Sequence, residues 1–164
     1  VSEYQDHISD DMRNRTRELD FSELQLITLA SIIEGEAIYD DERKNISSVY
    51  HNRLHKGMRL QADPTIQYII KDGPRRLLNK DLNIVSPYNT YLNEGLPIGP
   101  INNPGLQSII AALYPAETEY IYFVAKGDGY HTFSRTQEEH NFAKRKLNRL
   151  RKKISRERLM KKKE

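Results

Sequence analysis

The fold of this chain is decided by residues 22–37, which read SELQLITLASIIEGEA. Ser22 and Gln25 have the spacing of a capping box, and apolar residues follow at helical intervals, so this stretch predicts a helix that begins near Ser22. Glu34 and Glu36 stand in its otherwise apolar second half. A carboxylate drawn toward an apolar core is costly unless it is paired, solvated or used in chemistry.

Glu34 and Glu36 cannot both face the same cleft, because residues two apart on a helix lie about 200° apart around its axis. Glu36 lies over Leu29 and Ile32, whose apolar side chains would favour a protonated carboxyl group. We therefore predict that one glutamate acts alone, and that Gly35 leaves room for a ligand to approach the backbone. The alternative is a pair of glutamates on a solvated helix face.

The length and composition limit the function classes. The chain has 164 residues, enough for one compact domain with appendages, and it contains no cysteine, which excludes disulfides, thiolate chemistry and cysteine-bound metals. No apolar run reaches the roughly 20 residues of a membrane span, and no signal peptide is recognisable. Since the first residue is Val1 and not Met, we interpret the chain as a fragment whose targeting segment lies upstream.

Charge is divided unevenly along the chain. Residues 144–164 hold 12 Lys and Arg against 2 Glu, whereas residues 1–143 hold 14 Lys and Arg against 21 Asp and Glu. Lys and Arg bind any polyanion by releasing its counterions, so we predict that the tail adds affinity for anionic surfaces. We predict no specific nucleic acid as a partner, and we predict that the tail takes no part in catalysis. The alternative is a solvated terminal helix.

The remaining pattern predicts the order of the other elements. They are a helix over 40–57, an extended segment at 59–62, a short helix to residue 70, a loop over 73–105, a helix from 103 to 113, a hairpin over 120–134 and a closing helix from 136 into the tail. Thr136 and Glu139 have the spacing of a capping box for the closing helix. Asp63 is the predicted N-cap of the short helix, with Pro64 at its first position. We expect an α+β, helix-rich fold with a lysozyme-like groove and a small antiparallel β-hairpin or sheet.

Two histidines, His51 and His55, have the helical spacing that zinc proteases use for their metal. In those proteases a glutamate follows the first histidine, but this chain has Asn52, and no third ligand is evident. We therefore predict no metal and no cofactor, and we interpret both histidines as surface residues.

Nine short blocks in one order resemble the YceG-like family, the MltG endolytic murein transglycosylases. The blocks are ASIIEGE (30–36), NRL (52–54), GMRLQADPT (57–65), YNTY (88–91), GLP (95–97), NPG (103–105), YFV (122–124), HTF (131–133) and HN (140–141). The resemblance implies a catalytic domain at 21–143. The polar residues 1–20, which show little periodicity, predict a linker or loosely packed helix before it, and the charge pattern of residues 144–164 predicts a basic helical tail after it. The resemblance also implies a full-length protein held in the cell membrane by a single segment absent from this chain, with the domain outside the cytoplasm.

The resemblance assigns roles to individual residues. Glu36 matches the catalytic glutamate, the second in the Glu-x-Glu motif. The residues that match positions of the substrate groove are Gln61, Asp63, Tyr88, Asn89, Tyr91, Asn103 and His131. The implied substrate is the glycan strand of nascent peptidoglycan, cut internally, with penicillin-binding proteins of the synthesis machinery as candidate partners.

A single carboxyl group implies a particular mechanism. Hydrolases that cut glycosidic bonds normally use two carboxylates. In a lytic transglycosylase the muramyl C6 hydroxyl attacks its own anomeric carbon, so Glu36 would first donate a proton to the leaving oxygen and then accept one from that hydroxyl. The product is a 1,6-anhydro-MurNAc end. The alternatives are a muramidase that uses water on the same substrate and a non-catalytic module that binds glycan or polyanions.

Overall fold

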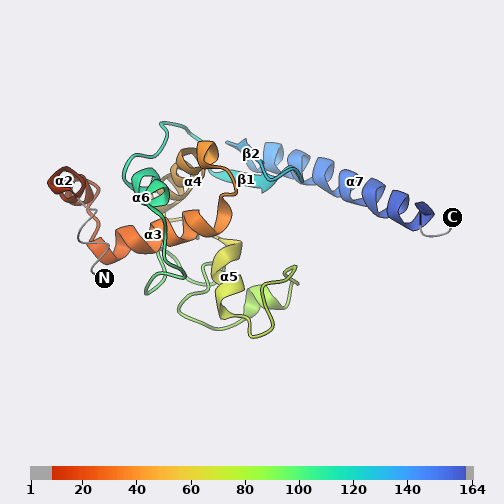
Figure 1. Cartoon of the computed structure of the whole chain (residues 1–164), viewed down its shortest axis with the longest axis horizontal. Coiled ribbons are helices and arrows are strands. Elements are labelled where there is room, and N and C mark those ends of the chain that lie inside the picture. Colours follow the sequence, from red (N-terminus) through yellow and green to blue (C-terminus); the bar gives the residue numbers. More distant parts are fainter. Residues whose placement is uncertain (1–8, 162–164) are drawn as a thin grey trace.

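The structure is a computed structural model, and it describes residues 9–161 (Figure 1). Its elements are α2 (Asp10–Glu18), α3 (Glu23–Glu36), the 3-10 turn η1 (Asp40–Glu42), α4 (Arg43–His55), α5 (Asp63–Ile69), the 3-10 turn η2 (Asp81–Asn83), α6 (Leu106–Leu113), β1 (Tyr122–Ala125), β2 (His131–Ser134) and α7 (Gln137–Lys161). The expected α+β, helix-rich fold with a small antiparallel sheet is confirmed. Among the described residues, no helix combines the length and apolar character needed to cross a membrane.

Helix α3 is the centre of the fold, and α4, α5 and α6 pack around it (Figure 1). The predicted capping box is present: the Ser22 side chain accepts from the Gln25 N–H, and the Gln25 side chain accepts from the Ser22 N–H. Leu24 in the first turn of α3 is exposed, but most apolar residues further along the helix are fully buried, among them Leu26, Leu29 and Ile32 at 0% exposure. Burial on all sides fixes α3 against its neighbours and so fixes the position of its last residue, Glu36.

The N-terminal segment contains a helix, one of the two alternatives predicted for residues 1–20. Ser9 caps α2, Thr16 is buried, and the guanidinium Nε of Arg15 donates to the Leu113 carbonyl over 3.2 Å. These contacts attach α2 to α3 and α6. The part of that prediction on residues 1–8 lies outside the described residues.

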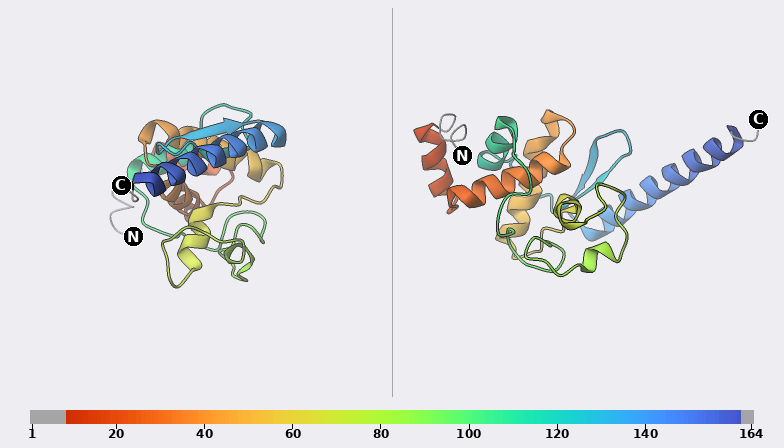
Figure 2. Two further views of the ribbon diagram at one scale, coloured as in Figure 1. Left: turned by 90° about the vertical axis from the view of Figure 1, so that its right-hand side faces the viewer. Right: turned by 60° about the horizontal axis from the view of Figure 1, so that its bottom comes forward.

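The predicted hairpin is confirmed, with β1 paired antiparallel to β2 and Phe123 opposite Phe133. The predicted cap of the closing helix is also present, because the Glu139 N–H donates to Thr136 Oγ1 and the Thr136 N–H donates to the Glu139 carboxylate. The first turns of α7 pack on the hairpin, and the rest of the helix extends away from the body (Figure 2). Hairpin and α7 together form one side of the molecule, beside the end of α3.

Two helix starts differ from prediction. Helix α6 begins at Leu106 with Gly105 as its N-cap, so Asn103 lies in the preceding loop. Helix α5 begins with Ala62 as its N-cap, which places Asp63 inside the first turn without a capping hydrogen bond. The predicted cap at Asp63 is therefore wrong, and its carboxylate is available for other contacts.

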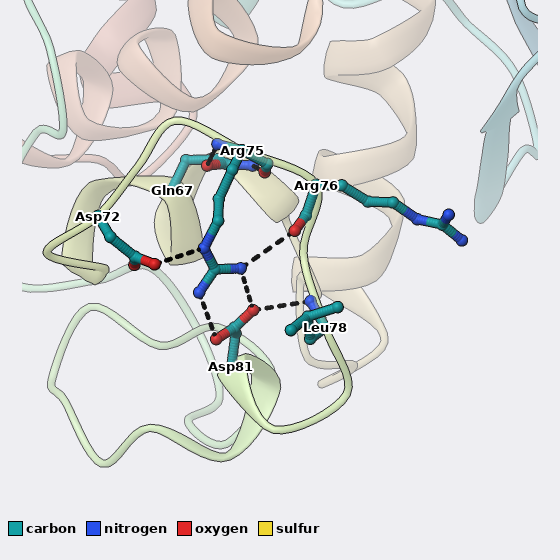
Figure 3. Close-up of polar contacts among 6 residues, drawn as sticks. All are labelled: Gln67, Asp72, Arg75, Arg76, Leu78 and Asp81. Atoms are coloured by element: carbon teal, nitrogen blue, oxygen red, sulfur yellow. Dashed lines mark hydrogen bonds and ion pairs between the residues drawn. The ribbon is translucent and has the colours of Figure 1, made fainter.

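The loop between α5 and α6 is held by an ion-pair cluster around Arg75 (Figure 3). The Arg75 guanidinium bonds both carboxylate oxygens of Asp81, at 2.7 and 2.9 Å, and its Nε bonds Asp72 at 2.9 Å. The Leu78 N–H also donates to Asp81, while the Gln67 side chain bonds the Arg75 backbone. The hydrogen bonds from Arg75 and Leu78 lower the pKa of Asp81 to about 2. The loop is thus ordered by a carboxylate that stays charged in acid.

We expect the replacement Asp81→Asn to loosen the loop while the helices stay folded. The carboxylate supplies charge-assisted hydrogen bonds that an amide cannot replace, so amide hydrogen exchange over residues 71–92 should speed up by about fivefold or more. Because the pKa of Asp81 is lowered in the folded protein, the wild-type loop should loosen in the same way as the pH falls from about 4 to about 2. Asp72→Asn is the matched control, since that carboxylate is exposed, and an equal effect there would contradict the role of Asp81.

Candidate active site

Two clefts meet at Glu36 and Asp63. The hairpin cleft has a volume of about 400 Å³ and is lined by Glu36, Arg53, Gln61, Asp63, Tyr91, Phe123, Val124, Ala125, His131, His140, Lys144, Leu147, Asn148 and Arg151. The loop cleft has a volume of about 590 Å³ and is lined by Gly35, Glu36, Asp63, Pro64, Gln67, Tyr68, Pro74, Ile101 and Asn102. The two carboxylates common to both clefts are therefore positioned to act on a ligand that spans them.

Glu36 is the last residue of α3, and its carboxyl group accepts a hydrogen bond from the Tyr50 hydroxyl over 3.0 Å. The pKa of Glu36 is raised to about 8, mainly by burial and also by the charge of Asp63, while the hydrogen bond from Tyr50 opposes both. A carboxyl group with this pKa is mostly protonated at neutral pH. Glu36 can therefore donate a proton as a general acid.

Asp63 reaches the clefts from the first turn of α5, where its Oδ1 accepts a 2.5 Å hydrogen bond from the Tyr91 hydroxyl. Burial raises the pKa of Tyr91, so this tyrosine remains a neutral donor. The arrangement holds a second carboxyl group beside Glu36, and the two acidic groups accept hydrogen bonds from different tyrosines, Tyr50 and Tyr91. Such pairs are typical of sites that transfer protons.

Gly35 brings α3 and α5 into close contact. A Cβ at this position would lie 2.7 Å from Pro64 Cβ, so only glycine permits the observed approach. The proline ring fills the space where a Cβ of residue 35 would lie, but Gly35 is exposed and lines the loop cleft, so its backbone stays accessible from that cleft. The close contact also sets the distance between Glu36 and Asp63 across the two helices.

Glu34 has a structural environment of its own. Its Oε2 accepts hydrogen bonds from Arg43 at 3.1 Å, from Ser108 Oγ at 2.7 Å and from the Gly105 N–H at 3.2 Å. It lines neither cleft. The two glutamates therefore differ in role as expected: Glu34 ties α3 to α4 and α6, and Glu36 faces the clefts.

Four of the predicted groove residues gather around Glu36. Gln61, Tyr91 and His131 line the hairpin cleft, and Asp63 lines both clefts. His131 is fixed by Glu42, whose carboxylate accepts from the His131 N–H and lies 2.9 Å from its Nδ1. This buried contact sets the orientation of the imidazole ring at the edge of the cleft.

The other three predicted groove residues line neither cleft. Asn89 is fully buried, and its side chain holds the loop by bonding the carbonyls of Leu82 and Ile84 and the Tyr91 N–H. Tyr88 packs its ring 4.8 Å from Tyr68, at the edge of the loop cleft. Asn103 is exposed in the loop before α6, whereas its neighbour Asn102 lines the loop cleft.

Sequence reasoning missed several residues of the site. Tyr50 fits an apolar position of α4 in the sequence, so the local pattern does not indicate that its hydroxyl bonds Glu36. Arg53 lines the hairpin cleft and bonds the backbone carbonyls of Ile121, Arg59 and Leu60.

Four residues of α7 also line the hairpin cleft, and all of them lie beyond the domain end predicted at residue 143. They are Lys144, Leu147, Asn148 and Arg151. That the tail takes no part in catalysis stays a prediction, but these four residues place its first turns at the cleft. The missed signal is their helical spacing, which places them on one face behind His140.

The two histidines on α4 differ from each other. His51 is buried, its Nε2 lies 2.8 Å from the Ala112 carbonyl, and burial lowers its pKa, so its interpretation as a surface residue is wrong. His55 is exposed, as expected. Within residues 9–161, no group of three or more His, Cys, Asp or Glu side chains is arranged to hold a metal ion.

Comparison with known proteins gives consistent matches. The model of the YceG-like family matches residues 1–146. Over 122 residues the chain is 52% identical to the endolytic murein transglycosylase of Bacillus subtilis, and over 123 residues it is 37% identical to the protein of that name from Streptococcus pneumoniae. These matches cover 74% and 71% of this chain, but only 34% and 22% of the relatives, so the chain spans about a third of the first relative.

A solved structure resembles most of this chain. It is the crystal structure of a yceG-like protein from Listeria monocytogenes, which is similar with a TM-score of 0.74 and 46% sequence identity. The match covers 80% of this chain and 42% of the other.

Proposed function

Because the chain belongs to the YceG-like family, we propose that it is the catalytic part of an endolytic peptidoglycan lytic transglycosylase. The substrate is the glycan strand, and the bond cut is the β-1,4 bond from MurNAc to GlcNAc. The observation that carries the proposal is a carboxyl group, Glu36, that is protonated at neutral pH and lies where two clefts meet. The name of the curated relatives, endolytic murein transglycosylase, supports the choice of substrate.

The proposed reaction begins with proton donation. Glu36 gives its proton to the glycosidic oxygen, the bond from MurNAc C1 to that oxygen breaks, and positive charge develops at C1. The C6 hydroxyl of the same sugar then attacks C1, and Glu36, now a carboxylate, accepts the hydroxyl proton. No water is consumed, the acid is regenerated, and the intramolecular nucleophile needs little activation because it is already close. The Asp63 carboxylate stabilises the charge at C1 electrostatically.

The two clefts account for internal cleavage. A site that is closed on one side would accept only the end of a strand. Here Glu36 and Asp63 border the hairpin cleft and also the loop cleft, so sugars can bind on both sides of the bond that is cut. Tyr68 in the loop cleft and Tyr91 and Phe123 in the hairpin cleft provide rings on which sugars can pack.

The proposal includes a cellular setting. Peptidoglycan is built outside the cytoplasmic membrane, so the domain works there, held to the membrane by another part of the full-length protein and close to penicillin-binding proteins. The resemblance of the sequence blocks to the family supports this setting. Co-purification of the full-length protein with penicillin-binding proteins from solubilised membranes tests it.

Product analysis in heavy-oxygen water tests the reaction. We expect digestion of purified peptidoglycan to release fragments whose new ends are 1,6-anhydro-MurNAc and carry no heavy oxygen. Asp63 favours the second candidate, a muramidase, because it supplies the second carboxylate that a hydrolase needs. Reducing ends that contain the label would establish that alternative, and the absence of any new ends would leave a glycan-binding module.

A further inference from the structure

The proximal part of α7 forms a cationic wall of the hairpin cleft. Lys144 and Arg151 line this cleft together with Glu36, and Asn148 lies between them. The helix is anchored in this position because Leu147 is buried and the His140 ring stacks on Tyr122 with centroids 5.0 Å apart. The acidic groups of the site and the basic side chains of α7 thus meet across one cleft.

The pattern of this wall continues beyond the cleft. Lys144, Arg151 and Arg158 are spaced seven residues apart, and seven residues make nearly two helical turns, so the three cations share one face of α7. The apolar residues Leu147 and Ile154 are also seven residues apart, and so are the polar residues Asn148 and Ser155. We call the three cations the α7 cationic stripe. Because α7 runs outward from the body, the stripe leads from the cleft into solvent (Figure 2).

The charged side chains of the stripe are accessible to a ligand. Its three side chains are exposed, and among the described residues the ion pair on this part of α7 joins Lys153 to Glu157 and uses none of them. At a rise of about 1.5 Å per residue, successive cations stand about 10.5 Å apart along the helix. This spacing is close to the length of one disaccharide of a glycan strand, which carries one peptide on each MurNAc.

We propose that the α7 cationic stripe binds the carboxylates of the stem peptides on the strand whose glycan occupies the hairpin cleft. The inference rests on the proposed function. The cleft itself indicates this ligand, because Lys144 and Arg151 line the same cleft as Glu36. An anion that binds these two side chains therefore belongs to the molecule that already occupies the cleft. The stripe thereby favours strands that still carry their peptides over strands from which an amidase has removed them.

The test compares two substrates and two double variants of the chain. The substrates are peptide-bearing glycan strands and the same strands stripped of peptides by an amidase. The stripe variant carries Lys144→Gln and Arg151→Gln. The control variant carries Arg145→Gln and Lys152→Gln. These two positions are also exposed and seven residues apart, and the change also removes one Lys and one Arg, but they lie about 100° around the helix from the stripe.

We expect the wild type to prefer peptide-bearing strands in kcat/KM by about three- to tenfold, since each exposed charge pair contributes modestly. The stripe variant should lose this preference, and the control variant should keep it. Equal losses on both substrates, or the same loss in the control variant, would overturn the inference. The inference would also be overturned if the preference for peptide-bearing strands disappeared on removal of phosphate-bearing polymers while the peptides were still present.

Failure of the proposed function is a separate result. Wild-type protein that cuts neither substrate would refute the proposed reaction directly. Wild-type protein that cuts both substrates equally well would leave the reaction intact and refute only the role of the stripe.

Discussion

Replacing Glu36 by glutamine will lower the rate of glycan cleavage by about a hundredfold or more while the protein stays folded. The amide has the size of the carboxyl group but cannot exchange a proton, and both steps of the proposed reaction need that exchange. Product ends counted by mass spectrometry give the rate, and circular dichroism gives the melting temperature.

The same variant should be more stable than the wild type in alkaline solution. Burial raises the pKa of Glu36 from 4.5 to about 8, so the charged form is disfavoured in the folded state. The resulting loss of wild-type stability begins above pH 4.5 and grows until about pH 8. The melting temperature of Glu36→Gln should therefore exceed that of the wild type by more at pH 8 than at pH 5.

Glu34→Gln is the matched control on the same helix. Its carboxylate bonds Arg43 and Ser108 and lines neither cleft, so the change should cost about 1 kcal/mol of stability and alter turnover by less than about threefold. If both variants are folded and both lose turnover to the same extent, the single-acid mechanism is wrong. Loss from Glu34→Gln alone would transfer the catalytic role to Glu34.

The sequence predicted those parts of the fold that local patterns determine. The capping box at Ser22, the hairpin over 120–134 and the cap at Thr136 depend on neighbours within a few residues, and all three are present. Asp63 shows the limit of such patterns. An aspartate before a proline resembles an N-cap, but the helix starts one residue earlier, and its carboxylate pairs instead with Tyr91 from a distant loop.

The same limit applies to the site. A carboxylate in an apolar helix is conspicuous by itself, which singles out Glu34 and Glu36, and the resemblance to the YceG-like family selects Glu36 between them. The different roles of Asn89 and Asn103 depend on how the loop between α5 and α6 folds back on itself. The ion pair of Arg75 with Asp81 and the hydrogen bond from Asn89 to the Ile84 carbonyl hold the loop in that conformation. The helical spacing of the α7 residues behind His140 indicates that they share one face, but that this face borders a cleft depends on how the helix packs against the hairpin.

The rate of cleavage should be nearly constant below about pH 7 and fall about tenfold for each pH unit above about pH 8. The acid form of Glu36 starts the reaction, and its pKa of about 8 sets the point where that form is lost. A profile of kcat/KM against pH on glycan strands measures this alkaline limb, because kcat/KM reports the pKa values of the free enzyme. A limb that begins near pH 5 would show that Glu36 is charged at neutral pH, which contradicts its role as the acid.

Two variants should move the alkaline limb in opposite directions. The charge of Asp63 raises the pKa of Glu36, so Asp63→Asn should shift the limb to lower pH. The hydrogen bond from Tyr50 lowers that pKa, so Tyr50→Phe should shift the limb to higher pH. The position of the limb, and not its height, is the measurement, because Asp63 lines the cleft and its loss also reduces the maximal rate. Shifts in the same direction, or no shift in either variant, would mean that a group other than Glu36 controls the limb.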